Sequence, residues 1–223
     1  IILLSTTLFA QQTTLLLKSE IIVLNSEIEV IKDNDMNYHF LCFSKIPTNK
    51  VKENIRDLGI DFLEYIPNRV YVVSIPKNTN ITTLSDFGIL AVSVIKPHYK
   101  IDPKLQNNNF PTWAFDNNKL SVKVLLYKNA DIYSTQKYFK SSKYQIEAIN
   151  ILSNSITLTI DPVELSVLST INEVWYIEPI DPPSEKENKT GRTLHRSNTI
   201  NTQYTSGRHY NGEGINIMMQ DDG

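Results

Sequence analysis

A repeated order of strand and helix patterns limits the fold of this chain more than any other feature. The first copy begins near Met36 and ends at Pro97. Alternating apolar residues predict strands, and apolar residues spaced three or four apart predict helices. The predicted order is strand (38–43), helix (48–58, ended by Gly59), strand (60–66), strand (70–75), helix (81–87) and strand (90–95). This βαββαβ order predicts a ferredoxin-like, or split-βαβ, unit.

The same order returns in the second half of the chain. It contains predicted strands at 122–127, 144–152, 156–160 and 174–177, with helices starting at Asp131 and Pro162. The two copies align at offsets of 81 to 86 residues, which indicates a duplication. Aligning Tyr38 with Val122 puts Phe40 and Cys42 on the face that carries Val124 and Leu126. Cys42 is therefore expected to be a small core residue.

The segments outside the two copies carry weaker patterns. Residues 11–35 contain two apolar runs, which are expected to supply one or two edge strands. Residues 103–119 are expected to form a loop, in which Trp113 covers a core; contact between Trp113 and a partner is the alternative. Residues 181–199 are polar and marked by prolines, which predicts an exposed linker.

Composition and charge exclude some classes of function. The chain is 41% hydrophobic and 21% charged, with a net charge of −2, as in ordinary globular proteins. Such a charge argues against binding to nucleic acid or through a polybasic patch to a membrane. The single cysteine, Cys42, cannot form an intrachain disulfide. The four histidines are scattered without metal-ligand spacing, so no metal or cofactor residues are predicted.

The first ten residues resemble the apolar half of a secretory signal peptide that ends at Ala10. They are too few to span a bilayer, and no membrane span is predicted. A buried strand or helix is the alternative. Export without disulfides suggests a bacterial secreted or periplasmic protein.

The last twelve residues contain the motif that bears on chemistry. Gly212-Glu-Gly214 precedes a short apolar run that ends at Gln220, and Asp221-Asp222-Gly223 follows. A short apolar run between turn signals is typical of a strand buried in a parallel sheet. A carboxylate at the carboxyl end of such a strand lies where α/β sheets place functional groups. A surface Asp-Gly turn is the alternative.

This motif resembles the first core strand of the catalytic domain in subtilisin-like serine proteases. The resemblance implies that Asp221 is the catalytic aspartate, and Asp222 is similar to the kexin-like branch; Gln220 departs from the aliphatic residue usual in the family. In a Ser-His-Asp triad the aspartate orients the histidine, which takes the proton of the serine. The histidine and serine would follow Gly223, so this fragment alone is expected to be inactive.

The resemblance also implies the roles of the upstream units. Subtilisin-like proteases carry a ferredoxin-like propeptide that assists folding, packs on its own catalytic domain, inhibits it and is then removed. The implied substrate is a polypeptide, and calcium is common in the family, although the sequence shows no binding site for it. We hypothesise that the maturation cut lies within residues 179–196, where Lys189, Arg192 and Arg196 are candidates.

The predicted fold class is α+β: two ferredoxin-like βαββαβ units in tandem, then a linker and the first strand of an α/β subtilisin-like domain. The expected divisions are a signal remnant (1–10), an extension (11–35), unit one (36–102), a loop (103–119), unit two (120–180), a linker (181–199) and the start of the catalytic domain (200–223). Two alternatives remain: a secreted binding or inhibitor module without protease activity, and a pair of regulatory ligand-binding domains.

Overall fold

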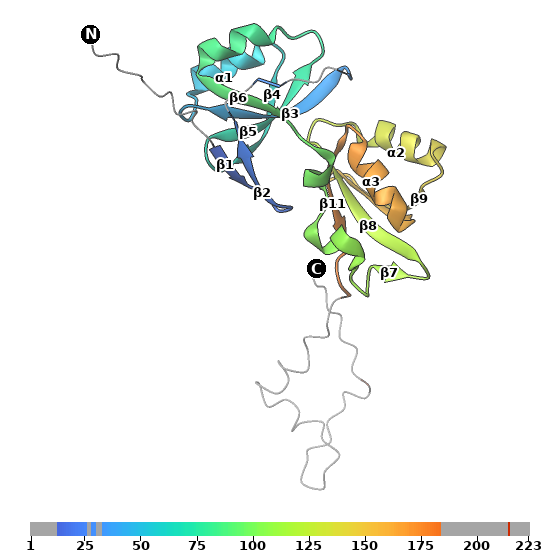
Figure 1. The fold of residues 1–223 in the computed structure, drawn as a ribbon. Coiled ribbons are helices and arrows are strands. Elements are labelled where there is room, and N and C mark those ends of the chain that lie inside the picture. The colour runs from blue at the N-terminus through green and yellow to red at the C-terminus, as the bar shows by residue number, and fades with distance from the viewer. Residues whose placement is uncertain (1–12, 26–27, 30–32, 184–213, 215–223) are drawn as a thin grey trace, which may run out of the picture. The chain divides into compact units, whose positions relative to one another are not determined.

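The computed structural model describes residues 13–25, 28–29, 33–183 and 214 of the chain. The described residues up to Pro182 form one compact body. This body is mixed α/β, with antiparallel sheets and few helices (Figure 1). The linker and the Asp-Asp-Gly segment lie outside the described residues, apart from Gly214 and the first residues after β11.

The first four-stranded sheet is antiparallel, with the strand order β4-β5-β3-β6. Its strands are β3 (Met36–Phe43), β4 (Asp61–Ile66), β5 (Val70–Pro76) and β6 (Ile89–Val94), and its helices are α1 (Asn49–Arg56) and the 3₁₀ helix η1 (Ile81–Phe87). As predicted, α1 begins after Thr48, whose hydroxyl accepts a hydrogen bond from the Val51 amide. Gly59 follows the helix at a φ of +84°, where glycine avoids the strain of a side chain.

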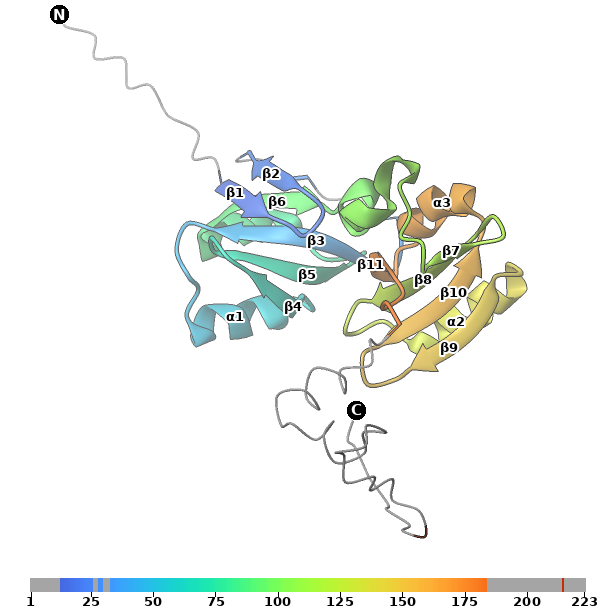
Figure 2. The ribbon, with the colours of Figure 1, turned by 90° about the horizontal axis from the view of Figure 1, so that it is seen from below.

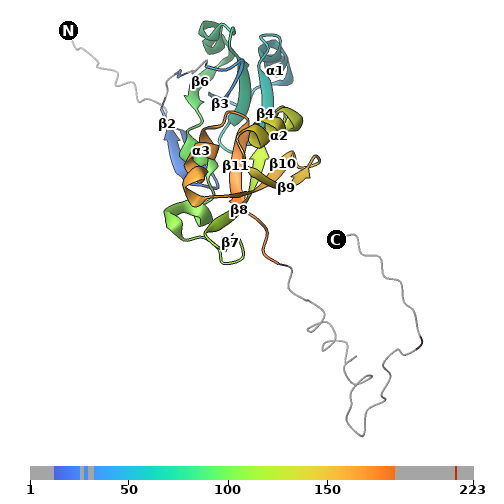
Figure 3. The same ribbon diagram turned by 90° about the vertical axis from the view of Figure 1, so that its right-hand side faces the viewer.

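The second sheet has the strand order β11-β8-β10-β9, with the short strand β7 paired to β8. Its elements are β7 (Phe115–Asp116), β8 (Lys119–Leu126), α2 (Ile132–Ser141), β9 (Gln145–Asn150), β10 (Ser155–Ile160), the 3₁₀ helix η4 (Pro162–Glu164), α3 (Leu165–Thr170) and β11 (Val174–Pro179), as Figure 3 shows. Asp131 caps α2 as predicted, because its carboxylate accepts from the amides of Tyr133 and Ser134. Two 3₁₀ helices, η2 (Pro97–Lys100) and η3 (Pro103–Asn108), lie between the sheets in the sequence.

The two sheets share irregularities as well as strand order. One extra residue interrupts the pairing of the last strand with the first, at Leu90 in β6 and at Trp175 in β11. Another interrupts the pairing of the second strand with the third, at Leu63 in β4 and at Glu147 in β9. Bulges are specific features of a strand pair, so their repetition gives a position-by-position correspondence between the sheets.

This correspondence corrects the predicted register of the first strands. The bulges equate Leu41 with Val124, so the offset is 83 residues and not 84. Phe40 and Cys42 therefore lie on the opposite face from the residues equivalent to Val124 and Leu126. Cys42 is buried as expected, but its core lies on the face away from α1.

One or two edge strands were expected from residues 11–35; residues 13–24 instead form a hairpin, whereas Ile28 bridges Val92 beside β6. Strands β1 (Thr13–Leu16) and β2 (Ile21–Leu24) pair with each other in a separate two-stranded sheet. Their inward side chains (Leu15, Ile22, Leu24) pack in one core with Phe40, Cys42, Val70 and Val72 of the first sheet. Figure 2 shows the hairpin and α1 on opposite sides of that sheet. Buried and exposed residues alternate along each strand, so each strand buries one face against the sheet, as expected of a segment that covers a sheet.

Two aromatic residues lie partly at the surface. Ile132, Thr135 and Phe139 occupy the buried face of α2, and Tyr138 is half exposed. Trp113 does not cover a core: its side chain is 40% exposed, and its indole Nε1 donates a hydrogen bond to the Ile180 carbonyl. Its fixed hydrogen bond explains why this large side chain remains at the surface.

The hairpin predicts an unequal response to two neighbouring substitutions. Leu15 is fully buried and Leu16 is 66% exposed. Leu15→Ala should lower the free energy of unfolding by about 2–5 kcal/mol, because it leaves a cavity. Leu16→Ala, the control, should change it by less than about 0.5 kcal/mol. Urea unfolding measures both, and equal losses would contradict the described hairpin.

Candidate functional site

The predicted catalytic residue, Asp221, lies outside the described residues, as do Lys189, Arg192 and Arg196. Gly214 of the same motif is described: it is an exposed turn residue with a φ of +79°. A positive φ suits glycine, as the Gly-x-Gly turn predicts. The structure thus leaves the triad aspartate a prediction.

In the described part of the chain, no three or more His, Cys, Asp or Glu side chains gather closely enough to hold a metal ion. No helix there is both long and apolar enough to cross a bilayer.

The second sheet has one face that its helices do not cover. Val122, Val124 and Leu126 of β8 point into the core with α2 and α3. The alternate residues form the opposite side, which we call the open face: Ser121, Lys123, Leu125, Gln145, Ala148, Thr157, Thr159, Tyr176 and Glu178. Most of these side chains are partly or fully exposed; Tyr176 is buried, as is Ser155, which shares this face.

The corresponding face of the first sheet is apolar and covered. By the bulge correspondence, Thr157 takes the place of Val72, and Lys123 that of Phe40. Val72 and Phe40 are buried under the β1–β2 hairpin, whereas Thr157 and Lys123 are partly exposed. At these equivalent positions the first sheet carries apolar side chains, whereas the second carries a hydroxyl and a charged side chain. Only in the first sheet has the described chain supplied a cover for this face.

A network of charges borders the open face. Lys18, in the hairpin turn, places its ammonium 2.7 Å from Glu178 and 3.1 Å from Asp102, and the Tyr176 hydroxyl donates to Asp102. Burial alone would raise the pKa of Asp102, but the Lys104 amide and the Lys18 ammonium outweigh it and lower the pKa. The carboxylate therefore stays ionised and holds the hairpin turn beside the second sheet.

The chain leaves the second sheet beside the same face. Ile180 donates its amide to the Ser121 carbonyl and accepts from the Trp113 indole through its own carbonyl. Lys123 lies 3.8 Å from Asp181, and Asp181 to Pro183 are exposed. The start of the linker is thus held next to the open face, with a hollow of about 310 Å³ at Trp113, Ser121 and Thr159.

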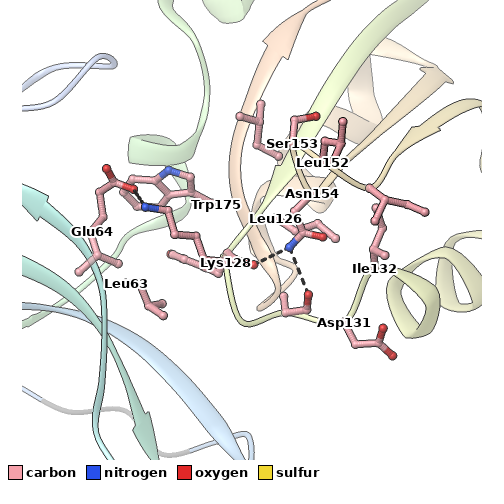
Figure 4. Close-up of a pocket in the computed structure, with 15 residues that line it drawn as sticks. Leu63, Glu64, Leu126, Lys128, Asp131, Ile132, Leu152, Ser153, Asn154 and Trp175 are labelled. Carbon is pink, nitrogen blue, oxygen red and sulfur yellow. Dashed lines mark hydrogen bonds and ion pairs between the residues drawn. The ribbon is translucent and has the colours of Figure 1, made fainter. Parts of the chain in front are cut away.

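A larger hollow of about 580 Å³ lies elsewhere on the unit (Figure 4). Leu63 and Trp175, two of the four bulge residues, contribute to its wall, and the Lys128 ammonium lies 2.9 Å from the Glu64 carboxylate. The Asn154 amide donates to the carbonyls of Tyr127 and Ala130, which fixes the wall behind it.

Two polar groups of this larger hollow make hydrogen bonds that stabilise the surrounding structure. Asp131 caps α2, and the Ser153 hydroxyl lies 2.8 Å from that of Ser155. Lys128 is paired with Glu64, so the charged groups named here already have partners within the chain.

Two buried basic side chains line a third hollow of about 210 Å³, together with Tyr127. Burial lowers the pKa of His39 to about 4 and that of Lys100 to about 8. The Lys100 ammonium donates to the Ile171 carbonyl at the end of α3. These groups fit a structural role, because each is shielded from solvent between packed elements.

Sequence reasoning missed the open face, although the signal was present. Residues 121–124 alternate between polar and apolar side chains, and residues 155–160 alternate Ser or Thr with Ile or Leu. Such alternation indicates one dry and one wetter face. The equivalent residues of the first copy, Val70 and Val72, show no such alternation, so the difference between copies was itself informative.

Comparison with known families matched residues 7–98 to a family described as a domain of unknown function (DUF8729). The match covers less than half of the chain and includes the hairpin and the first sheet. No curated protein and no solved structure matched the chain. The comparisons therefore attach no activity to it.

The buried His39 predicts loss of stability in mild acid. Its pKa is about 4 in the fold, against 6.5 normally, so the unfolded chain binds a proton first as pH falls. The free energy of unfolding keeps its full value with respect to His39 above pH 6.5. It falls by about 3 kcal/mol as the pH is lowered from 6.5 to 4. His39→Gln should remove this part of the pH dependence in urea unfolding.

His98→Gln is the matched control, because 59% of the His98 side chain is exposed. It should leave the pH dependence of unfolding close to that of the wild type. If His39→Gln keeps the full acid slope, His39 is not the group that titrates.

Proposed function

We propose that this chain is the N-terminal part of a secreted subtilisin-like serine endopeptidase. The two sheet units are its propeptide, and Asp221 is the first residue of an Asp-His-Ser triad that acts on polypeptides. The observation that carries the proposal is the open face of the second sheet, on a unit whose chain leads towards the Asp-Asp-Gly segment.

The strand order supports a ferredoxin-like assignment for both units. In each sheet the first and third strands are central, and the second and fourth lie outside them. That arrangement is the one produced by a split βαβ motif with antiparallel neighbours. The repeated bulges further support descent of the two units from one duplicated unit.

The second unit is the one that we assign to inhibition. An inhibitory propeptide must present a surface to its catalytic domain and later release it. The face of the first sheet is covered by the hairpin, whereas the hydroxyl-rich face of the second is partly exposed. Ser and Thr side chains can hydrogen-bond to a partner or to water, which suits a reversible contact.

The path of the chain supports the same arrangement. Residues through Ile180 are tied to β8 and Trp113, and the exposed chain begins at Asp181. A maturation cut within residues 179–196 would leave β11 nearly whole, whereas a cut before Val174 would remove it. The segment after the cut would carry Asp221 to the catalytic domain, where it would hold the tautomer of the catalytic histidine.

The proposal predicts different effects for two neighbouring carboxylates. In the full-length enzyme that it requires, Asp221→Asn should lower kcat by about 10⁴-fold, because the histidine would lose its orienting charge. Asp222→Asn, the matched control, should stay within a few-fold of wild type. Peptide hydrolysis measures both, and equal activity of the two variants would refute the role of Asp221.

The open face predicts which unit inhibits. Thr157→Arg should weaken inhibition of the mature enzyme by this chain added in trans by about tenfold or more, because a bulky charge enters the contact. Val23→Arg, on the exposed side of the hairpin, is the control and should leave inhibition unchanged. Urea unfolding first establishes that both variants fold. The inhibition constants of the two variants are then compared, and equal values would contradict the role of the open face.

A secreted binding or inhibitor module without its own protease is the second candidate, and the open face favours it equally. In that case the full gene product would hydrolyse no peptide and both Asp variants would be silent. The chain would still bind a partner through Thr157.

A further inference from the structure

A small aromatic pocket opens beside the open face, and its walls come from three parts of the chain. Leu125 and Tyr176 of the second sheet form one wall, and Phe40 of the first sheet and Tyr99 of η2 form another. The hairpin turn contributes Leu17 and Lys18. The volume is about 240 Å³. We call this hollow the aromatic pocket.

The size of the aromatic pocket limits what fills it. Pockets for drug-sized ligands have volumes of about 300–1,000 Å³. A hollow of 240 Å³ is smaller and suits one large side chain. Side chains that insert into such pockets near the centre of an interface often dominate its binding energy.

The charges at the rim indicate a neutral occupant. Lys18 lies 2.7 Å from Glu178 and 4.8 Å from the centre of the Tyr176 ring. Its charge is thus already balanced by Glu178 and Asp102. A charged side chain would have to break these pairs, whereas an aliphatic or aromatic one contacts only the apolar walls.

We infer that the aromatic pocket receives one large neutral side chain, such as Leu, Met or Phe, from the catalytic domain that docks on the open face. This inference rests on the proposed function. It gives the first unit a part in binding: Phe40, Tyr99 and the hairpin turn complete a pocket that the second sheet alone lacks. Trp175 lines the aromatic pocket and also the larger hollow, so its response reports on the aromatic pocket only when the Leu17 and Tyr99 variants weaken it.

Binding of a side-chain analogue tests the pocket without any enzyme. The chain is labelled at its two tryptophans, Trp113 and Trp175, and titrated with N-acetyl-phenylalaninamide while the indole NH signals are followed by NMR. The Trp175 signal should shift saturably, with a dissociation constant of about 10 mM. The Trp113 signal, an internal control on another element, should not move. N-acetyl-glycinamide, which lacks the side chain, should shift neither.

Two pocket variants and one control make the assignment specific. Leu17→Phe, at the half-buried turn, should fill the pocket, and Tyr99→Ala should remove a wall; each should weaken the Trp175 response at least fivefold. Val163→Phe adds the same ring at an exposed site outside the pocket and should change nothing. An unmoved Trp175 signal, or equal responses in all variants, overturns the pocket.

Inhibition of the mature enzyme in trans separates this inference from the proposed function. Leu17→Phe should raise the inhibition constant at least tenfold, and Val163→Phe should not. If the chain does not inhibit but Trp175 still responds, the proposed function fails and the pocket stands. If the chain inhibits and Leu17→Phe inhibits equally well, the inferred docking role is overturned.

Discussion

Burial of one face of the first sheet under the β1–β2 hairpin is the constraint on which the rest of the structure depends. Val70 and Val72 are apolar on that face, and Leu15 and Ile22 cover them. Without the hairpin, this apolar face would be exposed to water, which would cost about 25 cal/mol of folding free energy per Å² of exposed apolar surface. The hairpin also places Lys18 within reach of Asp102 and Glu178, so the cover of one sheet borders the open face of the other.

The two sheets are joined by aromatic contacts. The rings of Tyr38 and Tyr127 stack with centroids 3.6 Å apart and planes 7° from parallel, and Trp175 lies 5.2 Å from Tyr127. Burial raises the pKa of the Tyr38 hydroxyl to about 12. The Tyr127 hydroxyl is buried without a hydrogen-bond partner among the described residues, a cost of about 1–3 kcal/mol. Packing of the stacked rings must offset that cost.

The sequence predicted most individual elements, because their signals are local. Thr48, Asp131 and Gly59 mark helix ends through contacts within a few residues. The predicted face of the first strand was wrong because the alignment of the two copies depends on bulges. A bulge is a property of two paired strands and is not visible in one strand alone. An alignment error of one residue exchanges the faces of a strand.

The hairpin and the candidate site could not be derived in the same way. The pattern of residues 13–24 predicts two strands, but not whether they extend an edge or cover a face. The aromatic pocket brings Leu17, Tyr99 and Tyr176 together from distant positions, and none of them belongs to a local motif. Asp221 has the opposite character, because its motif is local, whereas its proposed role would require a histidine and a serine outside this sequence.

The two sheet units differ in the side chains at equivalent positions, and this difference gives a physical reason why the chain contains both units. Val72 and Thr157 occupy equivalent positions, so one sheet has kept an apolar face and the other a hydroxyl-rich one. An apolar face needs a permanent cover, whereas a hydroxyl-rich face can exchange water for a partner at small cost. A wet face binds weakly unless an apolar anchor accompanies it. In the proposed complex, the covered unit would supply part of that anchor through Phe40 and Tyr99, and the wetter unit could release its partner.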